Sequence, residues 1–144
     1  MASRLTRLLG ALSLLGVGVA HLQQYSADSY SAIPTIGTLF VLNFVSATAV
    51  ALVLVLPVGR IAGRRGEGLH AAAAVSGIAI ATGALAGLYV SEHGGLFGFT
   101  ERGYRGAIAV SVALEALTIV LLGLFLASAW ARRRGVGGAG FEPA

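Results

Sequence analysis

Four long apolar runs constrain this chain more than any other feature of its sequence. They cover residues 5–22, 36–56, 71–90 and 107–130, and each is close to the ~20 residues that an α-helix needs to cross a ~30 Å hydrocarbon core. Because backbone polar groups in lipid must be paired within the protein, helices are expected rather than strands with open edges. The chain is therefore predicted to be an all-α membrane protein, folded as an antiparallel bundle of four transmembrane helices.

The composition agrees with a membrane protein. Hydrophobic residues make up 56% of the chain and charged residues 11%, whereas about 25% of a soluble domain is charged. Cysteine is absent, which excludes disulfide exchange, thiolate metal sites and thiol nucleophiles. The basic residues lie in short segments between the apolar runs, where membrane topology explains them, so no nucleic-acid partner is expected.

The arginines predict the orientation of the bundle. Eight of them flank the runs on one side: Arg4, Arg7, Arg60, Arg64, Arg65, Arg132, Arg133 and Arg134. Only Arg102 and Arg105 flank the other side. By the positive-inside rule the eight-arginine side is cytoplasmic. Both termini and a loop at 58–69 are thus predicted on the cytoplasmic side of the cell membrane, with segments 23–35 and 91–105 on the outer side.

The first apolar run has some features of a cleavable signal peptide. It ends in His21-Leu22-Gln23-Gln24-Tyr25, which lacks the small-residue cleavage motif, so it is expected to be retained. Residues 1–134 are then one transmembrane domain. Residues 135–144 are rich in glycine and are expected to form a flexible cytoplasmic tail.

Small residues suggest how the helices pack. Gly83 and Gly87 form a GxxxG pattern in the third run, and Gly16 with Ala20 gives a similar face in the first. Helices in lipid associate largely through close backbone approach, which small residues permit. The third run is therefore expected to be the most buried helix, with Gly83 and Gly87 in a contact within the chain. A homodimer seam at these glycines is the alternative.

Three polar residues inside the runs are not required for membrane insertion. A charged side chain at the bilayer centre costs at least ~2.5 kcal/mol, yet Glu115 lies about nine residues, or roughly 13 Å, inside the fourth run. Asn43 lies at a similar depth in the second run, and His21 lies about one turn inside the first. We expect His21, Asn43 and Glu115 to face one outward-opening cavity, as ligand-binding or coupling residues. Alternatively, Glu115 is a protonated structural residue that donates to a carbonyl or to Asn43.

Histidines raise the question of a metal or haem site. His21 and His93 both lie toward the predicted outer face, and a bis-histidine haem needs two ligands that face each other across the bundle. His93 is expected just beyond the third helix, where it would not face His21. An interfacial role for both histidines is therefore preferred, and no cofactor is predicted.

Residues 21–25 and the Pro34–Asn43 stretch resemble a group of small bacterial four-span membrane proteins of unknown function. In that group a histidine ends the first helix, and a Pro-x-x-Gly-x-Leu-Phe-x-Leu-Asn-like stretch opens the second. The likeness covers about the first 55 residues, and the four-span layout more distantly resembles DoxX-like membrane proteins. The resemblance implies that His21, Gly37 and Asn43 belong to one site or one packing contact.

Three functions follow as hypotheses. The preferred one is an accessory bundle that binds a partner subunit, a lipid or a quinone-like small molecule. The second is a small proton-coupled transporter that uses Glu115 and functions as a homo-oligomer. The third is a redox subunit that binds haem or metal through the outer histidines. The sequence contains no GxxxxGK[ST] or HExxH motif, so an enzyme is not expected.

Overall fold

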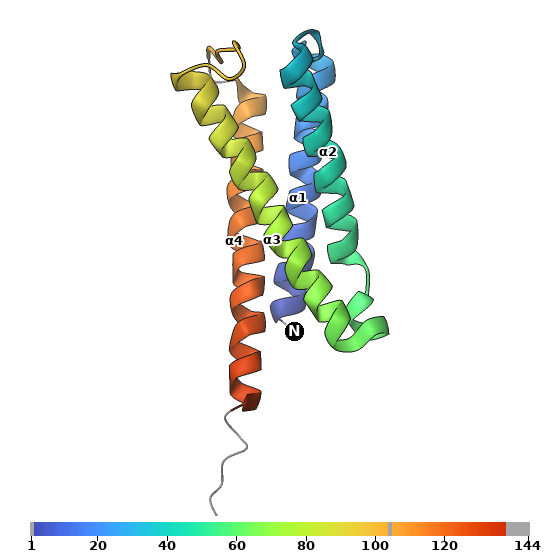
Figure 1. The fold of residues 1–144 in the computed structure, drawn as a ribbon. Coiled ribbons are helices and arrows are strands. Elements are labelled where there is room, and N and C mark those ends of the chain that lie inside the picture. The colour runs from blue at the N-terminus through green and yellow to red at the C-terminus, as the bar shows by residue number, and fades with distance from the viewer. Residues whose placement is uncertain (1, 104, 138–144) are drawn as a thin grey trace, which may run out of the picture.

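The computed structural model describes residues 2–103 and 105–137, and almost all of them are helical (Figure 1). The helices are α1 (Ala2–Ala27), the 3-10 turn η1 (Tyr30–Ala32), α2 (Pro34–Val55), α3 (Val58–His93) and α4 (Gly106–Gly137). Each of the four α-helices is long and apolar enough to cross a membrane. The predicted all-α antiparallel four-helix bundle is therefore confirmed. Pro34 stands in the first turn of α2, where its missing N–H leaves no hydrogen bond unmade.

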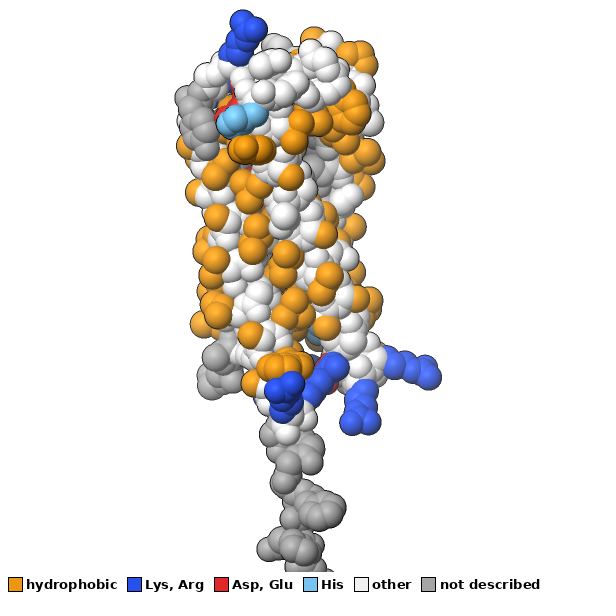
Figure 2. Space-filling view, turned by 60° about the vertical axis from the view of Figure 1, so that its left-hand side comes forward, with side chains coloured by type: hydrophobic (Ala, Val, Ile, Leu, Met, Phe, Trp, Pro, Cys, Tyr) orange, Lys and Arg blue, Asp and Glu red, His pale blue; other side chains and the backbone are white. Residues whose placement is uncertain are grey.

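The helices are arranged in a ring. α1 packs against α2 and α4, and α3 packs against the same two helices from the other side. The N-terminal end of α1 and the C-terminal end of α4 lie at the same end of the bundle (Figure 1). We call this the arginine end, because most of the blue side chains in Figure 2 gather there. The opposite end carries η1 and residues 94–103, which follow α3, and we call it the Tyr30 end.

Apolar side chains cover the flank of the bundle between its two ends (Figure 2). Every α-helix exposes large hydrophobic residues, among them Leu12, Leu42, Val75 and Leu117, each about half exposed or more. An exposed apolar surface of this extent would be unfavourable in water but is what a hydrocarbon environment requires.

The most buried helix is α1, not the third run as predicted. In the most apolar stretch of α1, 44% of the residues are buried, against 22% in α3. Glycines on α1 explain the difference, because they let neighbouring helices approach closely. A Cβ at Gly10 would lie 2.5 Å from Leu122 Cδ2 on α4, and one at Gly18 would lie 3.3 Å from the Phe44 carbonyl oxygen on α2.

The GxxxG residues do not make the expected close contact within the chain. A Cβ at Gly83 would meet nothing within 4 Å, and one at Gly87 would meet only Leu96 Cδ2, at 3.7 Å. The close approach on α3 is at Gly77 instead, where a Cβ would lie 2.7 Å from Leu122 Cδ1. Gly83 and Gly87 are on a part of α3 that lines a cavity, so neither glycine permits a close approach of another helix.

A short polar chain connects α1 and α4 in the interior. Thr118 Oγ1 donates to Ser13 Oγ at 3.0 Å, and Ser13 Oγ donates to the Leu114 carbonyl oxygen at 2.9 Å. Thr118 is fully buried. Interhelical hydrogen bonds of this kind stabilise membrane helix pairs by about 0.6 kcal/mol on average.

The predicted loop at 58–69 is helical in the structure. α3 begins at Val58 and changes direction at Gly63, whose φ of 51° and ψ of −128° are not helical. After this kink, Gly66 passes so close to the first turn that a Cβ there would lie 2.1 Å from the Val58 carbonyl oxygen. Glycine allows both features, since it has no Cβ. α4 likewise continues to Gly137, so residues 135–137 of the predicted tail are helical, and the rest of that tail lies outside the described residues.

Candidate functional site

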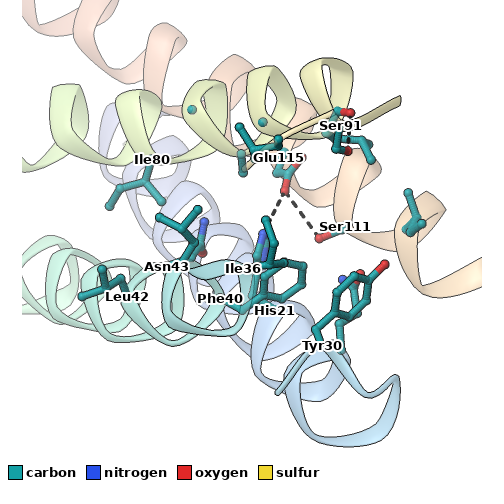
Figure 3. Close-up of a pocket in the computed structure, with 18 of the residues that line it drawn as sticks. His21, Tyr30, Ile36, Phe40, Leu42, Asn43, Ile80, Ser91, Ser111 and Glu115 are labelled. Carbon is teal, nitrogen blue, oxygen red and sulfur yellow. Dashed lines mark hydrogen bonds and ion pairs between the residues drawn. The ribbon is translucent and has the colours of Figure 1, made fainter. Parts of the chain in front are cut away.

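A cavity of about 340 Å³ lies in the half of the bundle toward the Tyr30 end, with all four helices contributing to its walls (Figure 3). Most of its lining is apolar and comes from α2 and α3. The polar members of the lining are His21, Gln24, Tyr30, Asn43, Ser46, Ser91, Glu101, Ser111 and Glu115. A largely apolar cavity with a few polar groups is the usual form of a small-molecule site.

The three polar residues singled out in the sequence all line this cavity. His21 comes from the last turns of α1, Asn43 from the middle of α2 and Glu115 from the first half of α4. The three residues come from three different helices. They reach the same cavity because the rise of 1.5 Å per residue puts them at similar depths along those helices. Figure 3 shows Glu115 and His21 facing each other, with Asn43 on the α2 side.

His21 and Glu115 form a buried pair. His21 Nε2 lies 3.8 Å from Glu115 Oε1, and Glu115 is only 2% exposed. The other ring nitrogen, Nδ1, lies 2.9 Å from the Val17 carbonyl oxygen, which can only accept a hydrogen bond. Nδ1 therefore carries a proton, and Nε2 is the nitrogen that faces the carboxyl group.

One further proton could reside on either side chain of this pair. With that proton on Nε2 the pair is an imidazolium beside a carboxylate, and with it on the carboxyl both groups are neutral. Either arrangement has no net charge, which is what a buried pair in an apolar region requires. Ser111 Oγ lies 3.4 Å from Glu115 Oε1 and can donate to it.

Asn43 has an unused hydrogen-bond acceptor. Its Oδ1 is buried and has no hydrogen-bond partner among the residues that the structure describes. The interhelical hydrogen bond from Glu115 to Asn43 that the sequence allowed is therefore not formed. An amide oxygen buried without a partner costs about 1–3 kcal/mol, so a donor that entered the cavity would be stabilised there.

A polar lock closes the cavity at the Tyr30 end. The Tyr30 hydroxyl donates to Glu101 Oε2, and Arg105 Nη2 donates to the Tyr30 oxygen at 2.8 Å. The Tyr30 ring stacks on Phe40, with centroids 4.7 Å apart. The backbone N–H of Glu101 also donates to the Ser91 carbonyl oxygen, at 3.1 Å. The lock joins the α1–α2 connection to the α3–α4 connection above the cavity.

Burial makes the Tyr30 phenol hard to ionise. Tyr30 is 4% exposed, and this desolvation, with the hydrogen bond to Glu101, raises the pKa of Tyr30 to about 12. At neutral pH Tyr30 is therefore a hydrogen-bond donor that holds Glu101 at the closed end of the cavity.

Glu101, Tyr30 and Ser111 belong to the site but were not predicted as site residues. The sequence assigned Tyr30 and Glu101 to the segments 23–35 and 91–105, which were predicted only to lie on the outer side of the membrane. Ser111 stands one helical turn before Glu115, and this i, i+4 spacing is a signal that could have identified it. No local signal pairs Tyr30 with Glu101, which is 71 positions away.

The histidines are not brought to one metal or haem site. His93 is the last residue of α3 rather than lying beyond it, and it is exposed and stacks on Tyr89 with centroids 4.2 Å apart. It does not line the cavity that contains His21. Within residues 2–103 and 105–137, no three His, Asp or Glu side chains lie close enough to hold a metal ion together.

Comparisons with known proteins add no family to these observations. No protein-family model, no curated protein and no solved structure matches the chain. The resemblance to small bacterial four-span proteins therefore stays a prediction, and the function is argued from the cavity itself.

Proposed function

We propose that this chain is a multi-pass protein of the cell membrane that binds a lipophilic molecule by its polar head, in the cavity lined by His21, Asn43 and Glu115. The bundle holds the molecule and performs no chemistry on it. The orphaned Asn43 oxygen carries the proposal, because a buried acceptor without a partner, at the base of an apolar cavity, is best explained by a ligand that donates to it.

The route into the cavity supports a ligand that arrives from the bilayer. Leu42 on α2 and Gly83 on α3 both line the cavity and are both exposed on the flank of the bundle. Their exposure supports an opening between α2 and α3, on a surface that is otherwise apolar. The Tyr30 lock lies across the end of the bundle. Entry from the bilayer between α2 and α3 is therefore less obstructed than entry through the Tyr30 end.

The polar groups favour a head that both donates and accepts hydrogen bonds. Asn43 Oδ1 needs a donor, whereas the Ser111 hydroxyl, or a proton carried by the His21–Glu115 pair, could be donated to an acceptor. A hydroxyl head meets both requirements. A quinol or a lipid with a free hydroxyl group is therefore the ligand class that fits this cavity.

The orientation forms part of the proposal. Eight of the ten arginines flank the apolar runs on the same side of the bundle as the arginine end. By the positive-inside rule this end is cytoplasmic. The cavity then lies in the outer half of the membrane, with both chain termini inside.

Native mass spectrometry of the protein purified in a mild detergent tests the binding function. The wild type is expected to retain a lipophilic molecule, and Asn43→Leu is expected to lose it, because leucine has a similar volume but no amide. Thr38→Leu is the matched control, since it also places leucine on α2 but Thr38 does not line the cavity. The proposal fails if Asn43→Leu and the wild type retain the same molecule equally.

The buried pair of His21 and Glu115 supports a second function, proton-coupled transport. A carrier of this kind needs a carboxyl group that gains and loses a proton as the site changes its access. Glu115→Gln should then keep the fold and insertion but abolish the pH dependence of ligand uptake into proteoliposomes. An unchanged pH profile in Glu115→Gln would leave binding without transport.

A further inference from the structure

The arginine end contains a second cavity, of about 930 Å³, which the proposed function does not use. It lies between the N-terminal part of α1, the first turns of α3 and the last turns of α4. Six arginines line it: Arg4, Arg7, Arg60, Arg64, Arg132 and Arg133. Among the described residues Glu67 is the one acid in the lining, so their formal charge is +5 with His70 neutral.

These guanidinium groups have almost no neutralising partners. Within the described part of the chain, no carboxylate lies within 4.0 Å of any of the six, because the ion pairs found there involve only His21 and Arg105. Like charges that face one cavity repel one another, and the repulsion is stronger where water is partly excluded. An anion in the cavity would remove this repulsion.

Arg7 is the strongest indication of a ligand. It is 9% exposed, and its guanidinium contacts His70 Nε2. Histidine cannot supply a negative charge, so this contact leaves the buried cation without a counter-ion. A buried charge is rarely found without an ionic partner.

From these observations we infer that the cavity at the arginine end binds a phosphate group. Arginine presents a planar fork of N–H donors that matches the oxygens of a phosphate, and several arginines together are the usual means of recognising one. The volume lies within the range of about 300–1,000 Å³ typical of small-molecule sites. The phosphate belongs either to the headgroup of an acidic phospholipid or to a soluble phosphate compound, and the chemistry of recognition is shared.

Arg64 and Arg65 provide a matched pair for the test. Both are exposed, they are neighbours on α3, and only Arg64 lines the cavity. Losing one charge-assisted contact to the phosphate should weaken binding about tenfold in Arg64→Gln. Arg65→Gln removes the same charge from the same turn and should change the affinity less than about twofold, the effect expected of a surface charge.

The binding experiment uses the full chain in mild detergent at fixed ionic strength. One arm titrates short-chain phosphatidylglycerol against phosphatidylcholine, and the other titrates inorganic phosphate against chloride. Binding of phosphatidylglycerol alone assigns the site to a lipid headgroup, and binding of inorganic phosphate assigns it to a soluble compound; both support the inference. It is overturned if neither anion binds, if phosphatidylcholine binds as well as phosphatidylglycerol, or if Arg65→Gln weakens binding as much as Arg64→Gln.

Discussion

Two alanine substitutions on α3 should change the stability of the bundle in opposite directions. Gly83 and Gly77 both lie inside this helix, six residues apart. Replacing glycine by alanine in a helix interior stabilises the folded state by roughly 0.5–1 kcal/mol, because the unfolded chain loses conformational freedom. This gain is common to both substitutions. Any difference between the two variants therefore measures the space around each glycine.

The structure gives a different space at each position. A Cβ at Gly83 meets nothing within 4 Å, so Gly83→Ala should show the full gain. A Cβ at Gly77 would lie 2.7 Å from Leu122 Cδ1 and 3.0 Å from Leu14 Cδ2. Both leucines are fully buried and cannot turn aside into solvent. Overpacking of this kind costs about 1–3 kcal/mol, so Gly77→Ala should be less stable than Gly83→Ala by that amount.

Reversible unfolding of the two variants in mixed micelles measures the difference directly. The free energy of unfolding should rise in Gly83→Ala and fall in Gly77→Ala relative to the wild type. If Gly83→Ala is the destabilised variant, then Gly83 packs against something and does not face a cavity. A loss that appears only at high protein concentration would identify the packing partner as a second copy of the chain.

Three further substitutions test other parts of the structure. Tyr30→Phe should remove a phenol absorbance step near pH 12. Because the pKa of Tyr30 is raised in the folded state, its contribution to the free energy of unfolding is present below about pH 10 and is lost as the pH rises to about 12. A Tyr30 that ionises near pH 10 in the folded protein would contradict the lock. Thr118→Val should lower the free energy of unfolding by about 0.6 kcal/mol, since it removes the donor to Ser13, and no change in micelle unfolding would argue against this link. Gly66→Ala should be the most destabilising of the set, because its Cβ would overlap the Val58 carbonyl oxygen, and a wild-type thermal unfolding curve would refute the tight turn.

The architecture and the location of the cavity follow from one-dimensional features of the sequence. An apolar run of about 20 residues predicts a membrane helix whatever its neighbours are. Depth along such a helix depends only on the residue count, so Glu115 and Asn43 could be placed at one level from their positions alone. His21 lies beside Glu115 in the structure, and their role in binding or coupling stays a prediction.

Packing and the helix ends could not be predicted in the same way. Which glycine meets a neighbour depends on the rotation and tilt of each helix, so the GxxxG at Gly83 and Gly87 indicated a contact that Gly77 makes instead. The helical turns from Val58 onward carry arginine and glycine, and hydropathy alone does not distinguish a polar helix from a loop there. The lock between Tyr30 and Glu101 depends on how two distant connections meet, which neither segment encodes by itself.

The most direct test of the binding cavity is to fill it. Gly83→Leu places a side chain in the open space of the cavity, whereas Ala86→Leu places the same side chain on an exposed position of α3 that does not line it. Native mass spectrometry of both variants, purified as the wild type, compares the lipophilic molecule that each retains. Gly83→Leu is expected to be folded but empty, and Ala86→Leu is expected to be occupied like the wild type. Equal occupancy in the two variants would contradict binding in this cavity.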